Sequence, residues 1–213
     1  MQTETLIAQL AGQVTVAPPH AATRRLCVTL MIGSMVAFGM LLVGLGLRPD
    51  IAQATHTAPF WMKWMFTLSL VWASVVVVRR LGDPDGRVGL AGWGLIAPVA
   101  IVAMMAAGEL MAAPESARAH MVLGRSFMQC FVTIPILAVP VFLGLLAAFQ
   151  RLAPVRLRLA GAAAGFLAGA AAASVYALAC PENTAAFMVT WYTAGMAVSA
   201  LVGAALGPRL LRW

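Results

Sequence analysis

Six long runs of apolar residues are the feature that most limits what this chain can fold into. Each is close to the roughly 20 residues that a helix needs to cross the hydrocarbon core of a membrane. A helix satisfies its backbone hydrogen bonds internally, so such runs predict membrane-spanning helices. The fold class expected is therefore an all-α integral membrane protein with six transmembrane helices. The predicted spans are Leu26–Leu47, Phe60–Val78, Leu90–Gly108, Gln129–Phe149, Leu157–Ala179 and Ala186–Leu206.

The charged residues are few and lie between these runs. Only 10% of the chain is charged, whereas soluble domains carry about 25%, which excludes an ordinary soluble domain. The formal net charge of +7 does not indicate nucleic-acid binding, because the basic residues flank the apolar runs as topology determinants do. We therefore expect the lipid bilayer as a partner and no direct contact with nucleic acid.

The distribution of lysine and arginine predicts the orientation of the chain. The side with the termini and the second and fourth loops carries ten of these residues, and the opposite side carries four, namely Arg48, Lys63, Arg118 and Arg125. Because positive charge is retained on the cytoplasmic side, both termini are expected in the cytoplasm. This divides the chain into a cytoplasmic tail, residues 1–25, and a transmembrane domain, residues 26–213.

Small residues recur every four positions in the last two spans. The fifth carries Gly161, Gly165 and Gly169, and the sixth carries Gly195, Ser199, Gly203 and Gly207. Small residues on one face let helix backbones approach closely. We expect a tight hairpin of these two helices in preference to a dimer interface.

The tail contains one short amphipathic segment. Thr3 can cap a helix that ends at Gly12, and Leu6, Ile7 and Leu10 then form an apolar stripe. About nine residues are too few to hold a helix alone in water, so the segment needs a surface to fold on. With no lysine or arginine before Arg24, attraction to lipid is weak, and binding to a partner protein is the favoured interpretation over a membrane-surface helix.

Two of the three cysteines are expected at the same depth in the membrane. The loop between the fourth and fifth spans is short, so these helices should be antiparallel neighbours. Cys130 and Cys180 are nearly equidistant from that loop, which places both thiols near the outer surface. Cys27 begins the first span on the inner side, cannot reach the other two, and is expected to be a reduced, packed thiol.

The surroundings of the two outer thiols differ. Cys130 lies near the amino-terminal end of its helix, where the dipole and Arg125 favour a thiolate, so it is predicted to be reactive. Cys180 lies at a helix carboxyl end before Pro181 and is predicted to be the resolving partner. A static disulfide, two inert buried thiols, and a soft-metal site completed by His120 and Glu182 remain alternatives.

Several short motifs, taken in order, resemble the NrsF family of bacterial membrane proteins, negative regulators of sigma factor F. The resemblance covers essentially the whole chain. Its marks are Leu6-Ile7-x-x-Leu10-Ala11, Gly46-Leu47-Arg48-Pro49-Asp50, Pro59-Phe60 with Lys63, Cys180-Pro181, Trp191-Tyr192, Gly203-Ala204 and the final Gly207-Pro208-Arg209-Leu210-Leu211-Arg212-Trp213.

The resemblance implies an anti-sigma factor of the bacterial inner membrane that holds an extracytoplasmic-function sigma factor away from RNA polymerase. It also implies that the positions of Cys130 and Cys180 sense oxidants or thiol-reactive metals from the periplasm. We expect the tail stripe to grip the sigma factor, aided by basic residues of the inner loops. These are Arg79, Arg80, Arg151, Arg156 and Arg158.

Two rival functions fit the sequence less well. A small transporter or exporter would usually need an ionisable group in the middle of a span, and Lys63 and Glu109 both lie near helix ends. Pro98, Pro135 and Pro140 are the only features in its favour. A membrane thiol oxidoreductase would need a CxxC pair, which is absent. No enzymatic activity and no cofactor are expected.

Overall fold

The computed structural model describes residues 21–82, 89–150 and 156–211, and the regular structure in these ranges is helical. Six helical segments are long and apolar enough to cross a membrane, which confirms the number of predicted spans. The long helices are α2 (Ala21–Gly44), α4 (Ala58–Gly82), α5 (Trp93–Ala112), α7 (Phe127–Phe149), α8 (Leu157–Tyr176) and α10 (Thr193–Leu210). Shorter elements are α3 (Ile51–Ala54), the 3₁₀ turn η1 (Gly89–Gly92), α6 (Glu115–Leu123), α9 (Ala185–Phe187) and the π-helical segment η2 (Met188–Tyr192).

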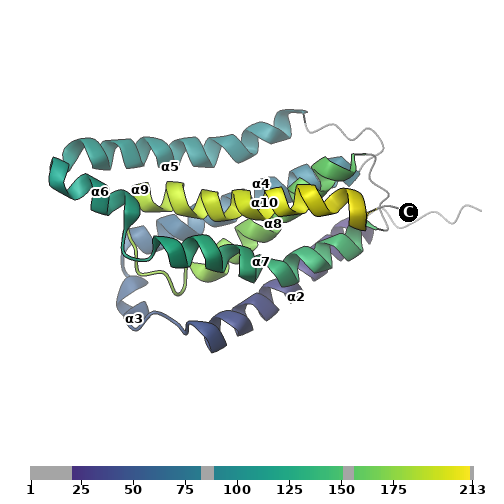
Figure 1. The fold of residues 1–213 in the computed structure, drawn as a ribbon, viewed down its shortest axis with the longest axis horizontal. Helices are drawn as coiled ribbons and strands as arrows, with labels where there is room; N and C mark the ends of the chain where they lie inside the picture. Colours follow the sequence, from purple (N-terminus) through teal and green to yellow (C-terminus); the bar gives the residue numbers. More distant parts are fainter. Residues whose placement is uncertain (1–20, 83–88, 151–155, 212–213) are drawn as a thin grey trace, which may run out of the picture.

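The long helices run side by side and define two ends of the molecule (Figure 1). At one end lie α3, α6 and α9 with Cys180, and we call it the cysteine end. At the other, the terminal end, α2 begins and α10 stops. The terminal end therefore gathers the parts of the chain that the charge count assigns to the cytoplasm. Which end faces which compartment stays a prediction.

Helix α8 is the centre of the bundle, and nearly every residue from Ala160 to Tyr176 is buried. It packs against α10, α7, α4 and α2. Its contact with α10 is the closest, since a methyl group added at Gly161 would meet the carbonyl oxygen of Gly203, and one added at Gly165 would meet that of Ser199. The predicted hairpin of the last two spans is confirmed. The four-residue spacing of small side chains lets these backbones touch.

The outside of the bundle is apolar. Large side chains such as Met35, Val43, Trp72, Met104 and Leu201 are exposed on different helices. Helix α5 lies at the edge, against α4 and the short α9 (Figure 1), and almost all of it faces outward. A bundle whose exterior is this apolar needs a lipid environment rather than water.

The helix boundaries differ from the predicted spans in places that have physical reasons. Helix α2 begins at Ala21, not at Leu26. The residues between them contain no helix breaker, and Arg24 and Arg25 are good helix formers. Helix α8 ends at Tyr176, three residues before Ala179, and the chain continues as turns.

The tail stripe Leu6, Ile7 and Leu10 lies outside the described residues. Cys27 is free, as expected, but it is exposed rather than packed. The inward face of α2 consists of Leu26, Gly33, Ala37 and Leu41, spaced by seven, four and four positions. The helical period therefore turns Cys27 outward. It lies near the terminal end, about 26 Å of helix from the other end of α2, and cannot join the other two thiols.

Candidate functional site

A non-helical loop between α8 and α9 carries Cys180. Its first residues wind tightly, with the Cys180 amide donating to the Tyr176 carbonyl at 3.1 Å. Pro181 has no amide hydrogen to extend the helix further, so the chain leaves the axis of α8 here. The loop therefore presents the backbone of Cys180 to the neighbouring helices.

The segment after α2 reaches this loop because α2 has a well-formed end. The amides of Leu45 and Gly46 both donate to the Leu41 carbonyl at 2.9 Å, and Gly46 has φ of 74°. This left-handed conformation favours glycine and turns the chain off the helix. The Arg48 amide then donates to the Leu178 carbonyl at 3.3 Å, which fixes Arg48 beside the loop.

Two basic side chains bind the carbonyl oxygen of Cys180. Arg48 Nη1 donates to it at 3.3 Å and Lys63 Nζ at 3.0 Å. Both side chains are buried, Arg48 at 6% exposure and Lys63 at 1%. A carbonyl at the end of a helix is a favourable partner for a cation, because the helix dipole is negative there. The pair of donors ties α4 and the end of α2 to the Cys180 loop.

Arg48 also forms a two-pronged ion pair with Asp50. Its Nε donates to Oδ1 and its Nη2 to Oδ2, both at 2.7 Å. The side-chain hydrogen bonds from Arg48 hold the pKa of the Asp50 carboxyl below its ordinary value, and Asp50 in turn raises the pKa of Arg48. Arg48 is thus a fixed, permanently charged link between its own loop and Cys180.

Lys63 has no comparable acidic partner within the residues that the structure describes. Its one hydrogen bond there is to the Cys180 carbonyl. The ionisable groups near enough to interact with its charge are Cys180, Arg48, Glu182 and Cys130. A buried ammonium normally needs an anion, so this arrangement is unusual.

Both outer thiols are fully buried and free. Cys130 lies in the first turn of α7, as predicted, and its amide donates to the Ser126 carbonyl at 2.9 Å. The two thiols lie near enough to interact electrostatically. The structure therefore brings Cys130 and Cys180 into one neighbourhood at the cysteine end, which is what their equal spacing from the fourth loop predicts.

Two tyrosines complete this neighbourhood. The rings of Tyr176 and Tyr192 lie 5.9 Å apart between centroids, and both side chains are buried. Each interacts electrostatically with Cys130 and Cys180. The Tyr192 hydroxyl has no hydrogen-bond partner among the described residues. It is therefore a buried polar atom in the neighbourhood of both thiols.

The π-helical segment η2 explains how Tyr192 reaches the site. Its neighbour Trp191 contacts the rings of Phe127 and Phe131, and its Nε1 donates to the Val122 carbonyl at 2.9 Å. Trp191 thereby binds the α6–α7 region while Tyr192 turns to Tyr176. Such π segments are rare in proteins overall, but those that occur are often found at functional sites. The Trp191-Tyr192 pair is visible in the sequence, but its π geometry is not.

Acidic side chains hold the far half of the Cys180 loop. Glu182 Oε1 accepts from the Arg125 amide at 2.7 Å and from Ser126 Oγ at 3.4 Å. Glu109 Oε2 accepts from the Ala185 amide at 2.9 Å, so an acid lies at the beginning of α9. The loop is therefore bonded to the beginning of α7 and to α5 as well as to Arg48 and Lys63.

Lys63 is a cation whose charge reaches Cys130, and the reactive role of Cys130 and the resolving role of Cys180 stay predictions. One expectation about the thiol site is wrong. The described residues contain no group of three or more His, Cys, Asp or Glu that could hold a metal ion, so His120 and Glu182 do not complete a metal site with the thiols. Glu182 instead binds the beginning of α7.

Lys63 and Arg48 are the site residues that sequence reasoning missed. The sequence did mark both residues as unusual. Lys63 is the one basic residue between Pro59 and Val78, and Arg48 lies in a Gly-x-Arg-Pro-Asp motif. Their common partner was hidden, because that partner is a main-chain carbonyl more than a hundred positions away.

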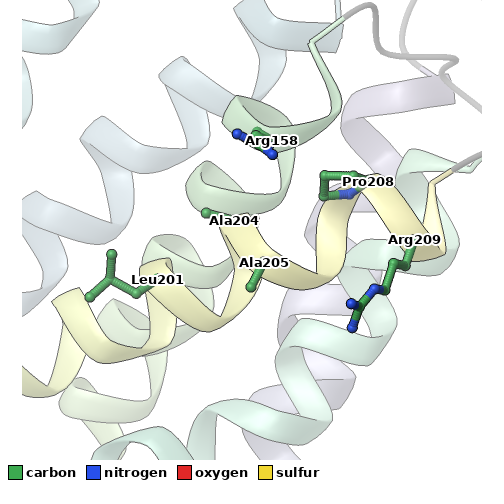
Figure 2. Close-up of a pocket in the computed structure, with 6 residues that line it drawn as sticks. All are labelled: Arg158, Leu201, Ala204, Ala205, Pro208 and Arg209. Carbon is green, nitrogen blue, oxygen red and sulfur yellow. The ribbon is translucent and has the colours of Figure 1, made fainter.

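A hollow lies at the terminal end, between α8 and α10 (Figure 2). It has a volume of about 530 Å³, and Arg158 of α8 and Arg209 of α10 line it. Neither arginine makes a hydrogen bond or ion pair within the described parts of the chain. The rest of the lining is apolar and small, with Leu201, Ala204, Ala205 and Pro208. The hollow is thus lined by two arginines without a hydrogen bond or ion pair to the described residues, and the rest of its lining is apolar.

Comparison with known proteins decides the family. The family model described as "Negative regulator of sigma F" matches residues 10–213. The chain belongs to the NrsF family. It is 38% identical over 213 residues to the "Probable anti-sigma-F factor NrsF" of Azospira oryzae, and 35% identical over 216 residues to the "Anti-sigma-F factor NrsF" of Caulobacter vibrioides. Each comparison covers the whole of both chains. No solved structure matches.

Membership of the NrsF family confirms the resemblance read from the short motifs. Arg48, Lys63, Cys180 and Tyr192 all belong to those motifs, and the structure gathers them at one end of the bundle. The family is regulatory, and its description names a sigma factor as the object of regulation.

Proposed function

We propose that this protein is a membrane-bound anti-sigma factor that sequesters an extracytoplasmic-function sigma factor and releases it when Cys130 and Cys180 are oxidised or capture a thiol-reactive metal. The observation that carries the proposal is the juxtaposition of two free thiols with a loop hydrogen-bonded to the end of α2. Helix α2 follows directly on the tail that is expected to hold the sigma factor.

The apolar exterior and the six long helices support a location in the bacterial inner membrane. The excess of lysine and arginine at the terminal end supports placing that end in the cytoplasm. The cysteine end then faces the periplasm, where oxidants arrive first. Sigma factors act on cytoplasmic RNA polymerase, so the signal has to cross the length of the bundle.

The chemical step of sensing is a two-electron oxidation. One thiolate attacks a hydroperoxide, forming a sulfenic acid and releasing hydroxide, or an alcohol's anion from an organic peroxide. The second thiol then attacks the sulfenic sulfur and forms the disulfide, with loss of water. Two thiols are oxidised and one peroxide is reduced. A soft metal ion bridging both sulfurs would draw the two residues together in the same way.

The route from the thiols to the tail follows the hydrogen bonds of Cys180. A disulfide to Cys130 would pull the Cys180 backbone toward the beginning of α7. The carbonyl of Cys180 would then move away from Arg48 and Lys63, which hold it at 3.3 Å and 3.0 Å. Arg48 is anchored to the end of α2, so a shift there displaces α2 as a rigid body and moves the tail at its other end.

At the cytoplasmic end, the grip on the sigma factor combines apolar and charged contacts. The Leu6, Ile7 and Leu10 stripe supplies the apolar part. The hollow with Arg158 and Arg209 lies at the same end and supplies two positive charges that make no hydrogen bond or ion pair within the described residues. It fits an acidic segment of the sigma factor, with Arg79, Arg80 and Arg156 adding to the local field.

Co-purification from the native host tests the proposal. The full-length protein is extracted in mild detergent from cells that are kept reduced or exposed to hydrogen peroxide. A sigma factor bound in the reduced sample and depleted in the oxidised one is expected. Equal amounts in both would keep the anti-sigma role and remove the thiol sensor. No sigma factor in either, with crosslinking, would favour the alternative of a small membrane transporter.

The double variant Cys130→Ser with Cys180→Ser separates sensing from sequestration. It should bind the sigma factor as the wild type does and repress a sigma-dependent reporter even under peroxide. Normal induction in this variant would end the sensing proposal. Cys27→Ser is the matched control, because Cys27 lies at the opposite end and should leave induction unchanged.

A further inference from the structure

We infer that the hollow between α8 and α10 is a binding site for an anionic phospholipid of the leaflet at the terminal end. The phosphate would lie at Arg158 and Arg209, and an acyl chain would lie along Leu201. This lipid site does not depend on the proposed function. Its regulatory consequence, that the lipid and the sigma factor compete for the same two arginines, rests on the proposed function.

The hollow opens on the outside of the bundle. Leu201 in its lining is 70% exposed, and Leu159 and Leu210, the chain neighbours of the two arginines, are exposed as well. Ala205, also in the lining, is exposed. Because the surrounding surface is apolar, it faces lipid, and a ligand enters the hollow from the bilayer.

The two arginines lie at the depth of the lipid headgroups. Arg158 is in the first turn of α8 and Arg209 is in the last turn of α10, so each is at one end of a span. Both are exposed, and neither makes a hydrogen bond or ion pair within the described residues. A guanidinium binds a phosphate through two parallel N–H groups. The hollow therefore has two phosphate-binding groups at its charged end.

The apolar part of the lining continues from the arginines toward the centre of the membrane. Leu201 lies eight positions before Arg209 on α10, which is about 12 Å along the helix. Between them the small side chains of Ala204 and Ala205 leave room, and the hollow has a volume of about 530 Å³ (Figure 2). An acidic peptide would occupy only the charged end. A phosphate joined to an acyl chain fills both parts, so a lipid is the ligand that this shape favours.

The charge of the hollow distinguishes between phospholipids. Every phospholipid has a phosphate, but phosphatidylcholine also has a trimethylammonium group, which two nearby guanidinium groups would repel. Phosphatidylglycerol has only the negative charge. Basic pockets between membrane-spanning helices bind anionic headgroups in this way. The hollow should therefore prefer phosphatidylglycerol to phosphatidylcholine.

Lipid binding to the purified protein tests the site. The full-length protein is delipidated in a mild neutral detergent and titrated with either lipid, and bound lipid is counted by native mass spectrometry. We expect phosphatidylglycerol to bind about tenfold more tightly, and Arg158→Gln with Arg209→Gln to abolish this preference. Arg118→Gln with Arg125→Gln, the same change at the cysteine end, should keep it. Equal affinities in the wild type, or a preference that survives loss of Arg158 and Arg209, would overturn the inference.

The acyl chain is tested apart from the charges. Ala205→Phe fills the apolar part of the hollow and keeps both arginines, and it should fold because Ala205 is exposed. This variant should also lose the preference for phosphatidylglycerol. Glycerol phosphate, which has the phosphate without the chains, should not displace the lipid from the wild type. Full preference in Ala205→Phe, or displacement by equimolar glycerol phosphate, would contradict a lipid site and indicate recognition of a free phosphate ester.

Competition is measured in nanodiscs of phosphatidylcholine with or without phosphatidylglycerol. Purified sigma factor should bind the wild type several-fold more weakly when phosphatidylglycerol is present. Ala205→Phe should bind equally in both discs, because it excludes the lipid and keeps the arginines. A persisting difference in Ala205→Phe would indicate repulsion by the membrane surface and contradict competition.

The failures of the two proposals are distinguishable. If no sigma factor binds in either disc, the proposed function fails, and the lipid site is still decided by mass spectrometry. If sigma factor binds equally to the wild type in both discs, the proposed function stands and competition is contradicted.

Discussion

The ammonium of Lys63 donates a hydrogen bond at 3.0 Å to the main-chain carbonyl of Cys180, which lies 117 positions further along the chain. Both residues are buried at the cysteine end. The bond joins α4 to the loop that follows the central helix α8, and Arg48 joins the end of α2 to the same oxygen. One carbonyl thus connects three parts of the bundle, and its neighbourhood contains both outer thiols.

Replacing Arg48 should destabilise the protein more than replacing an exposed arginine. Arg48→Ala removes the ion pair with Asp50 and a buried hydrogen bond to Cys180. Hydrogen bonds to charged groups are worth about 1.5–3 kcal/mol, so a loss of about 2–3 kcal/mol is expected. Thermal unfolding in detergent, followed by tryptophan fluorescence, measures it. Arg118→Ala, which removes one exposed hydrogen bond, is the control. Equal losses in both variants would contradict the buried link.

The ion pair of Arg48 and Asp50 should make stability depend on acid pH. The pKa of Asp50 is lowered in the folded protein by its hydrogen bonds from Arg48. Its contribution is therefore present above the unfolded value of about 3.9 and is lost as pH falls through the lower folded value. Asp50→Asn should be less stable than the wild type at pH 6, and this difference should shrink as the pH falls below about 3.9. A difference that stays constant over this range would exclude titration of Asp50 as its cause.

The close approach of α8 and α10 should not tolerate a single added methyl group. In Gly165→Ala the new methyl would meet the Ser199 carbonyl oxygen and backbone of α10. The helices must separate, at a cost of about 1–3 kcal/mol, the range for overpacking. Gly39→Ala is the matched control, because nothing lies within 4 Å of that position and alanine favours the helix. Melting temperatures of the two purified variants give the comparison. A Gly165→Ala protein as stable as Gly39→Ala would mean that the two backbones are farther apart.

Charge reversal in the hollow of Figure 2 should weaken sigma binding. Arg158→Glu with Arg209→Glu removes two positive charges from the lining and adds two negative ones. A loss of about tenfold in affinity corresponds to about 1.4 kcal/mol, and it should shrink at high salt because exposed charges are screened. Binding of the purified sigma factor at low and high salt measures both effects. The control is Arg118→Glu with Arg125→Glu at the cysteine end, which makes the same change in net charge. An equal loss in the control would indicate a general charge effect.

The parts of the fold that follow from periodicity could be predicted from the sequence. Apolar length gives the number of spans, and the four-residue spacing from Gly161 to Gly169 predicts the tight contact with α10. The equal spacing of Cys130 and Cys180 from one loop predicts that they share an end of the bundle. Each of these features depends on residues that are close in sequence or on one repeated interval.

The parts of the site that depend on main-chain partners could not be predicted. The loop after α8 leaves the helix at Tyr176, and this exposes the Cys180 carbonyl to Lys63 and Arg48. The π-helical segment η2 sets the direction of Tyr192, and its sequence shows no sign of it. The nearness of Lys63 to Cys130 could not be predicted for the same reason, since only the folded chain shows which cation comes near.

If the thiols sense oxidants as proposed, their complete burial limits how fast the protein can respond. A reagent cannot reach a sulfur atom that has no exposed surface, so each reaction must wait for the Cys180 loop to open. When the oxidant is abundant, the opening rate sets the pace, and adding more oxidant no longer speeds the response. Brief pulses shorter than the opening time would pass without effect, and sustained exposure would accumulate. In the proposed sensor, the hydrogen bonds that hold this loop closed would therefore set the time that induction takes, in addition to positioning the thiols.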